Sequence, residues 1–285
     1  MTPYELRFPA HAGTFYAGTR ERLLRQIRWC FTHDLGPGEA PTVSKAPMGN
    51  IVSAIVPHAG YVYSGPVAAH AYAALARDGV PDVVVAMGPN HTGVGSAVAL
   101  MAEGAWRTPL GDVEVDKEVA LRISRRSPII DIDATAHAYE HSIEVQLPFL
   151  QFIYGSAFRL VPICLMMQDL RTAREVGEAV SSALSGMNAI VLATTDLTHY
   201  EPQRMAEQKD RLVTEAISRL DEASLQRVVE SRRVSMCGLG PTSAAIVASK
   251  GLGAKRAELL CYKTSGDVTG DYTAVVGYSS FKMVK

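Results

Sequence analysis

A short apolar run that leads into a turn with a histidine occurs three times in this chain, and this repetition constrains the fold most. The runs 51–56, 82–87 and 189–193 are followed by His58, His91 and His199. Short β-branched runs bounded by turn residues are typical of buried strands. If the three strands are parallel, the three histidines emerge at one edge of a sheet, where open α/β folds bind ligands.

The remaining pattern indicates an α/β architecture. Helical spacing of apolar residues at 116–126, 169–184 and 204–220 alternates with strand-like runs through most of the chain. This alternation predicts a three-layer sandwich with a central, mostly parallel sheet and helices on both faces. With 285 residues, of which 47% are hydrophobic, we expect one domain over residues 1–285, although two small domains also fit that length.

The end of the chain and one proline carry local signals. Two strands near 257–264 and 272–280 are expected to add antiparallel edges, with the turn-rich segment 265–271 as a loop between them.

A helix is expected at 66–77, after the turn that contains His58. Pro148 is expected to end or kink the helix in which it lies.

Composition excludes several classes of partner. The net charge is −1 and no basic block is present, so a nucleic-acid partner is not expected. No apolar run approaches membrane length, and no signal-like segment precedes Pro9. The four cysteines are widely spaced and form no CxxC pair. We therefore expect a cytoplasmic protein without a membrane partner, in a reducing compartment.

Imidazoles that converge on one edge are typical of a metal or acid/base site. Asp196 precedes His199 by three residues, and it can contact that imidazole or the incoming ligand if a helix starts there. Cys237 lies in a glycine-rich turn at a helix entrance, where the helix dipole and backbone donors favour a thiolate. The alternative for Cys237 is a small buried thiol that fills space.

Two further segments contribute candidate pocket residues. In the loop 8–17, His11 and Tyr16 either face a pocket or pack. Glu140, His141 and Glu144 lie at or near the start of a predicted helix. Acidic groups are favoured at a helix N-terminus, whereas a protonated histidine is not. His141 therefore has two open roles, a helix-terminal residue or a residue that points into the site.

Several long motifs, taken together and in order, resemble one known family. The chain resembles the Memo family, whose microbial members are called AmmeMemoRadiSam system protein B. This resemblance implies the fold of the class III extradiol ring-cleaving dioxygenases. The motifs are HAGTFY at 11–16, PHAGYVYSG at 57–65, GPNH at 88–91, EHSIEVQLPFLQ at 140–151, TTDLTHY at 194–200, MCG at 236–238 and SGDVTGD at 265–271.

The resemblance also implies roles for individual residues. His58 and His91 match the two histidine ligands of a non-haem iron, and His199 matches the acid/base, with Asp196 to orient it. Cys237 stands where the dioxygenases have a glutamate. A thiolate is softer than a carboxylate and favours Cu(I), zinc or iron of altered potential, so ring cleavage itself is not expected.

Three functions are compatible with these residues. The first is a redox enzyme that uses Fe(II) or copper, held by His58, His91 and Cys237, on an unknown substrate. The second is a non-catalytic module that binds a peptide or a small anion in the same pocket. The third is a zinc hydrolase, since two histidines and a cysteine also form catalytic zinc sites.

The family name further implies a pathway link to a radical-SAM protein and an Amme-type protein. The expected pocket residues are His11, Tyr16, Tyr61, Tyr63, Glu140 and His141.

Overall fold

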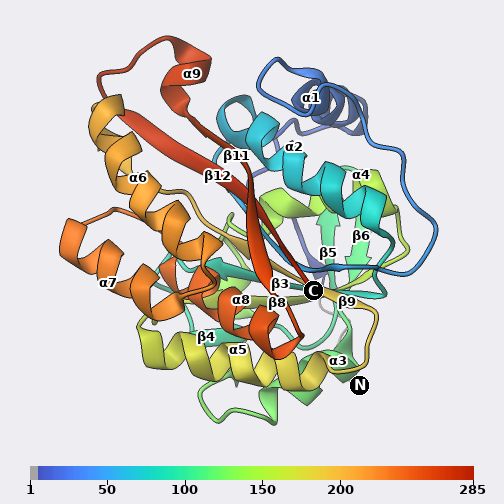
Figure 1. Ribbon diagram of the computed structural model, residues 1–285. Helices are drawn as coiled ribbons and strands as arrows, with labels where there is room; N and C mark the ends of the chain where they lie inside the picture. Colours follow the sequence, from blue (N-terminus) through green and yellow to red (C-terminus); the bar gives the residue numbers. More distant parts are fainter. Residues whose placement is uncertain (1–5) are drawn as a thin grey trace.

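The computed structural model describes residues 6–285 and has a mixed sheet covered by helices on both faces (Figure 1). The strand order is β10-β12-β2-β9-β3-β8-β4-β7, and β11 pairs with the other side of β12. Its strands are β2 (Ile51–Val56), β3 (Val83–Pro89), β4 (Val98–Leu100), β7 (Asp131–Ile132), β8 (Arg159–Leu165), β9 (Ala189–Thr194), β10 (His199–Glu201), β11 (Arg256–Thr264) and β12 (Val275–Val284). A small second sheet contains β1 (Leu6–Arg7), β5 (Ala105–Thr108) and β6 (Gly111–Glu114).

The helices divide into two layers (Figure 1). One layer contains α1 (Arg20–Thr32), α2 (Tyr61–Asp78) and α4 (Leu147–Tyr154). The other contains α3 (Lys117–Ser124), α5 (Leu170–Leu184), α6 (Gln203–Ser218), α7 (Glu222–Arg232) and α8 (Leu239–Gly251). The remaining helical elements are the short α9 (Ser265–Thr269) and the 3₁₀ turns η1 (Thr135–His137) and η2 (Glu144–Gln146). Within residues 6–285, no helix combines the length and apolar character that a membrane crossing requires.

Each central strand contributes to both hydrophobic layers because successive side chains point to opposite faces of the sheet. In β3, Val83, Val85 and Met87 pack toward the layer of α5 and α8. Val84 and Ala86 pack toward α2. A strand buried on both faces must be apolar at every position, which explains why β3 is a continuous run rather than an alternating one.

The sheet is mixed, with parallel strands at its centre and in the edge pair β4–β7, and with the expected antiparallel strands at the end of the chain. Strands β2, β9, β3 and β8 are parallel neighbours, whereas β12 and β4 flank them in antiparallel orientation. β11 and β12 form a long antiparallel pair around α9. A short connection of this kind joins antiparallel strands, whereas parallel strands need a crossover. The three strands predicted to end in histidine turns are β2, β3 and β9, and their carboxyl ends meet at one edge.

Three local expectations differ from the structure. The helix expected at 66–77 begins earlier, at Tyr61, and contains Pro66. Pro148 lies in the first turn of α4 instead of ending a helix, since the first turn of a helix does not require its N–H. The segment 265–271 is not entirely loop, because a capping box between Thr264 and Asp267 starts α9 there.

A buried carboxylate fixes the N-terminal segment against the rest of the chain. Glu144 is fully buried and forms an ion pair with Arg7, at 2.8 Å between Nη2 and Oε2. It also accepts hydrogen bonds from the backbone N–H groups of Ala10 (3.0 Å) and His11 (2.9 Å), and from the Tyr16 hydroxyl (2.7 Å). One side chain therefore holds the whole loop that carries His11.

We predict that Glu144→Gln lowers the free energy of unfolding by about 3 kcal/mol, because it leaves the Arg7 cation buried without its partner charge. The measurement is urea denaturation. Glu118→Gln is the matched control, since Glu118 pairs with Arg122 on the surface of α3. The control is expected to change stability by less than about 0.5 kcal/mol. Equal losses in the two variants would contradict the central role of Glu144.

Candidate functional site

A cavity of about 610 Å³ lies where β2, β3 and β9 end. Four histidines line it, His58, His91, His141 and His199. The cavity is bounded on its other side by β10, β12 and the α9 segment. A second cavity of about 590 Å³ lies beside the first residue of β2 and contains none of these four histidines. The three histidines that follow the predicted strands, His58, His91 and His199, therefore line one cleft.

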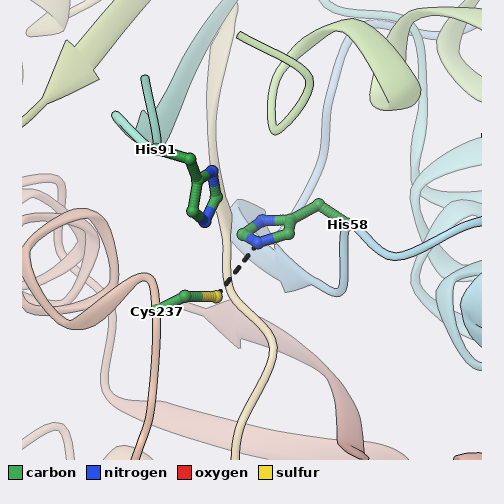
Figure 2. Close-up of side chains that lie close together, drawn as sticks. All are labelled: His58, His91 and Cys237. Carbon is green, nitrogen blue, oxygen red and sulfur yellow. Dashed lines mark hydrogen bonds between the residues drawn. The ribbon is translucent and has the colours of Figure 1, made fainter. Parts of the chain in front are cut away.

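His58 is buried at the floor of this cleft. Its Nδ1 lies 2.8 Å from the Thr194 hydroxyl, and its Nε2 lies 3.0 Å from Sγ of Cys237 (Figure 2). Burial lowers the pKa of His58 well below its ordinary value, and the nearby His141 and His91 lower it further. His58 is consequently a neutral imidazole at neutral pH, the form that binds metals.

Glu140 fixes both the backbone and the ring of His91. Its carboxylate accepts the backbone N–H of His91 at 2.6 Å and lies 2.9 Å from His91 Nδ1. It also accepts the N–H of Ser142 at 2.9 Å. Burial by itself raises the pKa of Glu140, but hydrogen bonding and the charges of His91 and His141 together lower it to about 2. An ionised Glu140 makes Nδ1 the protonated nitrogen of His91, which leaves Nε2 for a ligand.

Cys237 precedes Gly238, the N-cap residue of α8. Its Sγ accepts the backbone N–H of Asp196 at 3.1 Å. Only glycine fits at position 238, because a Cβ there would lie 2.1 Å from the Thr194 carbonyl oxygen. Burial raises the pKa of the Cys237 thiol, and the charge of Asp196 raises it further. The backbone N–H of Asp196 lowers this pKa, as expected of a backbone donor, but burial outweighs it, so the expected thiolate is not favoured in the protein alone.

Three side chains converge on one point. One ligand atom from each of His58, His91 and Cys237 lies within 4.8 Å of the others, and Figure 2 shows these side chains pointing toward one another. Ligands of a single ion lie within about twice a metal–ligand bond of roughly 2.0–2.3 Å, so this triad has the right size for one metal. Within residues 6–285, two further triads meet the same distance limit, and they share residues with the first: His91 with Glu140 and His141, and Asp196 with His199 and Cys237.

Asp196 is hydrogen-bonded to His58, and a ligand atom of His199 lies within 4.8 Å of its carboxylate. Its Oδ1 accepts the backbone N–H of His58 at 2.9 Å, and its Oδ2 lies 4.0 Å from His58 Nε2. The expected helix start is absent, since residues 195–198 form no helix and His199 begins β10. Burial raises the pKa of Asp196 to about 6. Asp196 therefore faces the predicted metal position and changes its protonation near neutral pH.

The tautomer of His199 follows from its neighbours. Its Nδ1 lies 2.7 Å from the Leu197 carbonyl oxygen and 2.8 Å from the Ser235 carbonyl oxygen. Two acceptors at one nitrogen require a proton on it, so Nε2 of the neutral ring carries the lone pair. His199 is thus arranged to accept a proton at Nε2 in the cleft, or to donate electrons to a metal.

The other expected pocket residues separate into two groups. His141 and Tyr63 line the cavity, and His141 stacks on His91 with 4.6 Å between ring centroids. Burial lowers the pKa of His141 to about 4. Tyr16 and Tyr61 instead lie in the core beneath the cleft, where their hydroxyls donate to Glu144 and to the Val145 carbonyl. His11 and Glu140 do not line the cavity. The His11 ring lies 5.5 Å from the His141 ring between centroids, and Glu140 contacts Nδ1 of His91.

Sequence reasoning missed Tyr200, Tyr278, Thr194 and Phe15. Tyr200 lines the cleft with a positive φ of 57°, a conformation that no turn residue signals. Thr194 pairs with Val56 across the parallel strands β9 and β2, which places its hydroxyl beside His58. Strand register decides this pairing, so the local sequence around Thr194 does not predict it. Phe15 and Tyr200 could have been predicted as pocket residues, because each is an aromatic residue next to a candidate site residue in the sequence.

Comparisons with known proteins give a consistent result. The chain matches the model of a family described as Memo-like protein over residues 7–282. It is 56% identical to a "MEMO1 family protein" of Methanopyrus kandleri, over 96% of this chain and 97% of that protein. It is 51% identical to a protein of the same description from Methanothermobacter thermautotrophicus, over 96% of this chain and 99% of the relative.

A solved structure is similar in fold alone. It is the crystal structure of an uncharacterized protein from Escherichia coli K12, with a TM-score of 0.53 and 11% sequence identity. The match covers 80% of this chain and 99% of the other. At this level of identity the similarity concerns the arrangement of strands and helices and carries no information on ligands.

We predict that the Glu140 carboxylate stabilises the folded protein by about 3 kcal/mol through its lowered pKa. The folded pKa of about 2 lies below the ordinary value of 4.5. The contribution is therefore fully present above pH 4.5 and is lost as the pH falls toward 2. Urea denaturation across this range should show the wild type and Glu140→Gln converging at low pH. Glu230→Gln, at an exposed position, is the control. A constant difference between wild type and Glu140→Gln would contradict the assignment.

Proposed function

We propose that this chain, which belongs to the Memo-like protein family, binds one transition-metal ion through His58, His91 and Cys237. The convergence of these three donor atoms carries the proposal. Both imidazoles have Nδ1 engaged, one by the Thr194 hydroxyl and the other by Glu140. Such outer hydrogen bonds orient ligating histidines and increase their basicity.

The donor set suits iron, copper or zinc. Two imidazoles and a thiol are softer than the two histidines and one carboxylate of the extradiol dioxygenases. We propose that the resident metal is iron or copper, which would supply one-electron redox chemistry at the floor of the cleft. Because the resemblance to the extradiol dioxygenases implies Cys237 in place of their carboxylate ligand, we do not expect efficient catechol cleavage.

The surrounding residues have roles in moving protons. His199 Nε2 can accept a proton from a ligand bound in the cleft, since its Nδ1 proton is held by two carbonyl oxygens. Asp196, with its pKa raised to about 6 by burial, can exchange a proton with the same ligand near neutral pH. Both side chains line the cavity.

Two other functions remain as alternatives that use the same cleft. A zinc hydrolase would use the same three ligands and a metal-bound water, and metal analysis distinguishes it from the redox enzyme. A peptide- or anion-binding module has less support. Among the described residues that line the cavity there is no lysine or arginine to hold an anion.

We predict that protein purified without oxygen contains about one metal ion per chain, and that His58→Ala and Cys237→Ser lose it. A neutral hydroxyl is a poor replacement for a thiolate ligand. Elemental analysis by mass spectrometry is the measurement. Cys261→Ser, a substitution on β11, is the matched control and should keep the ion. An unchanged metal content in both site variants would remove Cys237 and His58 from the metal site.

We predict that His199→Ala weakens metal binding by less than about tenfold, because His199 acts on protons rather than on the metal. His58→Ala, measured alongside, should weaken it by more than about a hundredfold. The measurement is anaerobic titration with Fe(II) and with Cu(I) against a competing chelator. Equal losses in the two variants would make His199 a metal ligand, in line with its place in the triad with Asp196 and Cys237.

A further inference from the structure

We propose that the cleft selects ligands in which an organic cation, an ammonium group, is attached to a planar ring. The cation would lie at the mouth of the cleft and the ring would extend inward toward His58. This inference rests on the proposal that the cleft is the ligand site. It goes beyond that proposal because it names the charge and shape of the ligand.

The fixed charges of the cleft are negative. Of the described residues that line it, two carry carboxylates, Asp196 at the floor and Asp271 at the mouth, and none is a lysine or arginine. On the neighbouring surface, Lys209 is paired with Glu201 and does not line the cavity. Asp271 is exposed to solvent, so its attraction for a charged group is modest, but the sign of its charge favours a cation over an anion at the mouth.

Asp271 is held in a fixed position. Its Oδ1 accepts hydrogen bonds from the backbone N–H of Thr273 at 2.9 Å and from the Thr273 hydroxyl at 2.6 Å. Both bonds end on the same oxygen, and Oδ2 is therefore the atom that can accept a bond from an ammonium group. The loop that carries Asp271 follows α9, which closes one side of the cleft.

Aromatic side chains surround the same opening. Phe15, Tyr63 and Tyr200 line the cavity, and Tyr278 contributes a buried ring deeper inside. Tyr63 is 44% exposed and Tyr200 is 78% exposed. Exposed tyrosine rings bind ammonium groups through their π faces, and they also stack on planar ligands. This combination of aromatic rings and a carboxylate is typical of sites for organic cations.

The backbone at Tyr200 is strained in a way that presents its ring to the cleft. Its φ of 57° lies in the left-handed region, which costs a non-glycine residue about 1 kcal/mol. The pairing of β10 with β12 shifts register between His199 and Glu201, so Tyr200 sits in an irregular position of the strand. Strain retained at a ligand cleft is characteristic of residues that contact the ligand.

The test compares three ligands that share one phenol ring and differ in the charge of the tail: tyramine, 4-ethylphenol and 3-(4-hydroxyphenyl)propionate. Isothermal titration at low ionic strength measures their dissociation constants. We expect tyramine to bind about three- to tenfold more tightly than 4-ethylphenol, from one cation–π contact and one solvent-exposed ion pair. The propionate should bind most weakly.

Substitutions identify the residues that cause the preference for tyramine. Asp271→Asn should weaken tyramine binding about three- to fivefold and leave 4-ethylphenol unchanged. Tyr200→Ala should weaken tyramine binding, whereas Tyr200→Phe, which keeps the ring, should not. Asp131→Asn is the matched control, since Asp131 is an exposed aspartate on β7 at the other end of the sheet. This control should bind all three ligands as the wild type does.

Three outcomes would overturn the inference: equal or tighter binding of the propionate, no binding of any of the three ligands, or an Asp271→Asn variant that keeps the full preference for tyramine. The titrations are run on metal-free and metal-loaded protein, and metal content is measured independently. A preference for tyramine in both forms supports the inference even if the proposed metal ligands fail their own test. Metal binding without that preference overturns this inference alone.

Discussion

Two buried carboxylates, Glu140 and Glu144, hold together the segments that form the cleft. Glu140 fixes the backbone and the ring of His91 at the end of β3. Glu144, four residues further along the chain, fixes Arg7 and the loop of His11. A buried charge is costly unless it is paired and hydrogen-bonded, and each of these carboxylates meets that condition with partners from another segment. The cleft therefore depends on the segment 140–144 more than on any single histidine.

The same low-dielectric environment prepares the donor atoms for a metal. Burial keeps His58 and His141 neutral, and it keeps Cys237 as a thiol. A transition metal requires neutral imidazoles and a thiolate, so the histidines are ready and the cysteine is not. We infer that metal uptake releases the Cys237 proton, and that Asp196, close to Sγ, is placed to receive it. Uptake should accordingly become weaker as the pH falls.

The cleft also has two chemically different ends. Its floor gathers imidazoles and a thiol, while its mouth has exposed tyrosine rings and the carboxylate of Asp271. These ends come from different parts of the fold. The floor is made by the parallel strands at the centre of the sheet, and the mouth by the antiparallel β10, β12 and the α9 segment. A ligand that enters the cleft past β10, β12 and α9 would therefore meet the mouth residues before it reaches the histidines at the floor.

The sequence by itself determined the three strand–turn–histidine units and the family, because apolar periodicity, turn residues and ordered motifs are local properties of the chain. Parallel pairing of β2, β9 and β3 then brought His58 and His91 to one edge, as those units predicted. Only the tertiary structure decided that Tyr16 and Tyr61 face the core, that Asp196 accepts a hydrogen bond from the His58 backbone, and that burial raises the pKa of Cys237. Strand register, burial and the identity of distant neighbours fix these properties, and none of them is encoded within the few residues that surround each side chain.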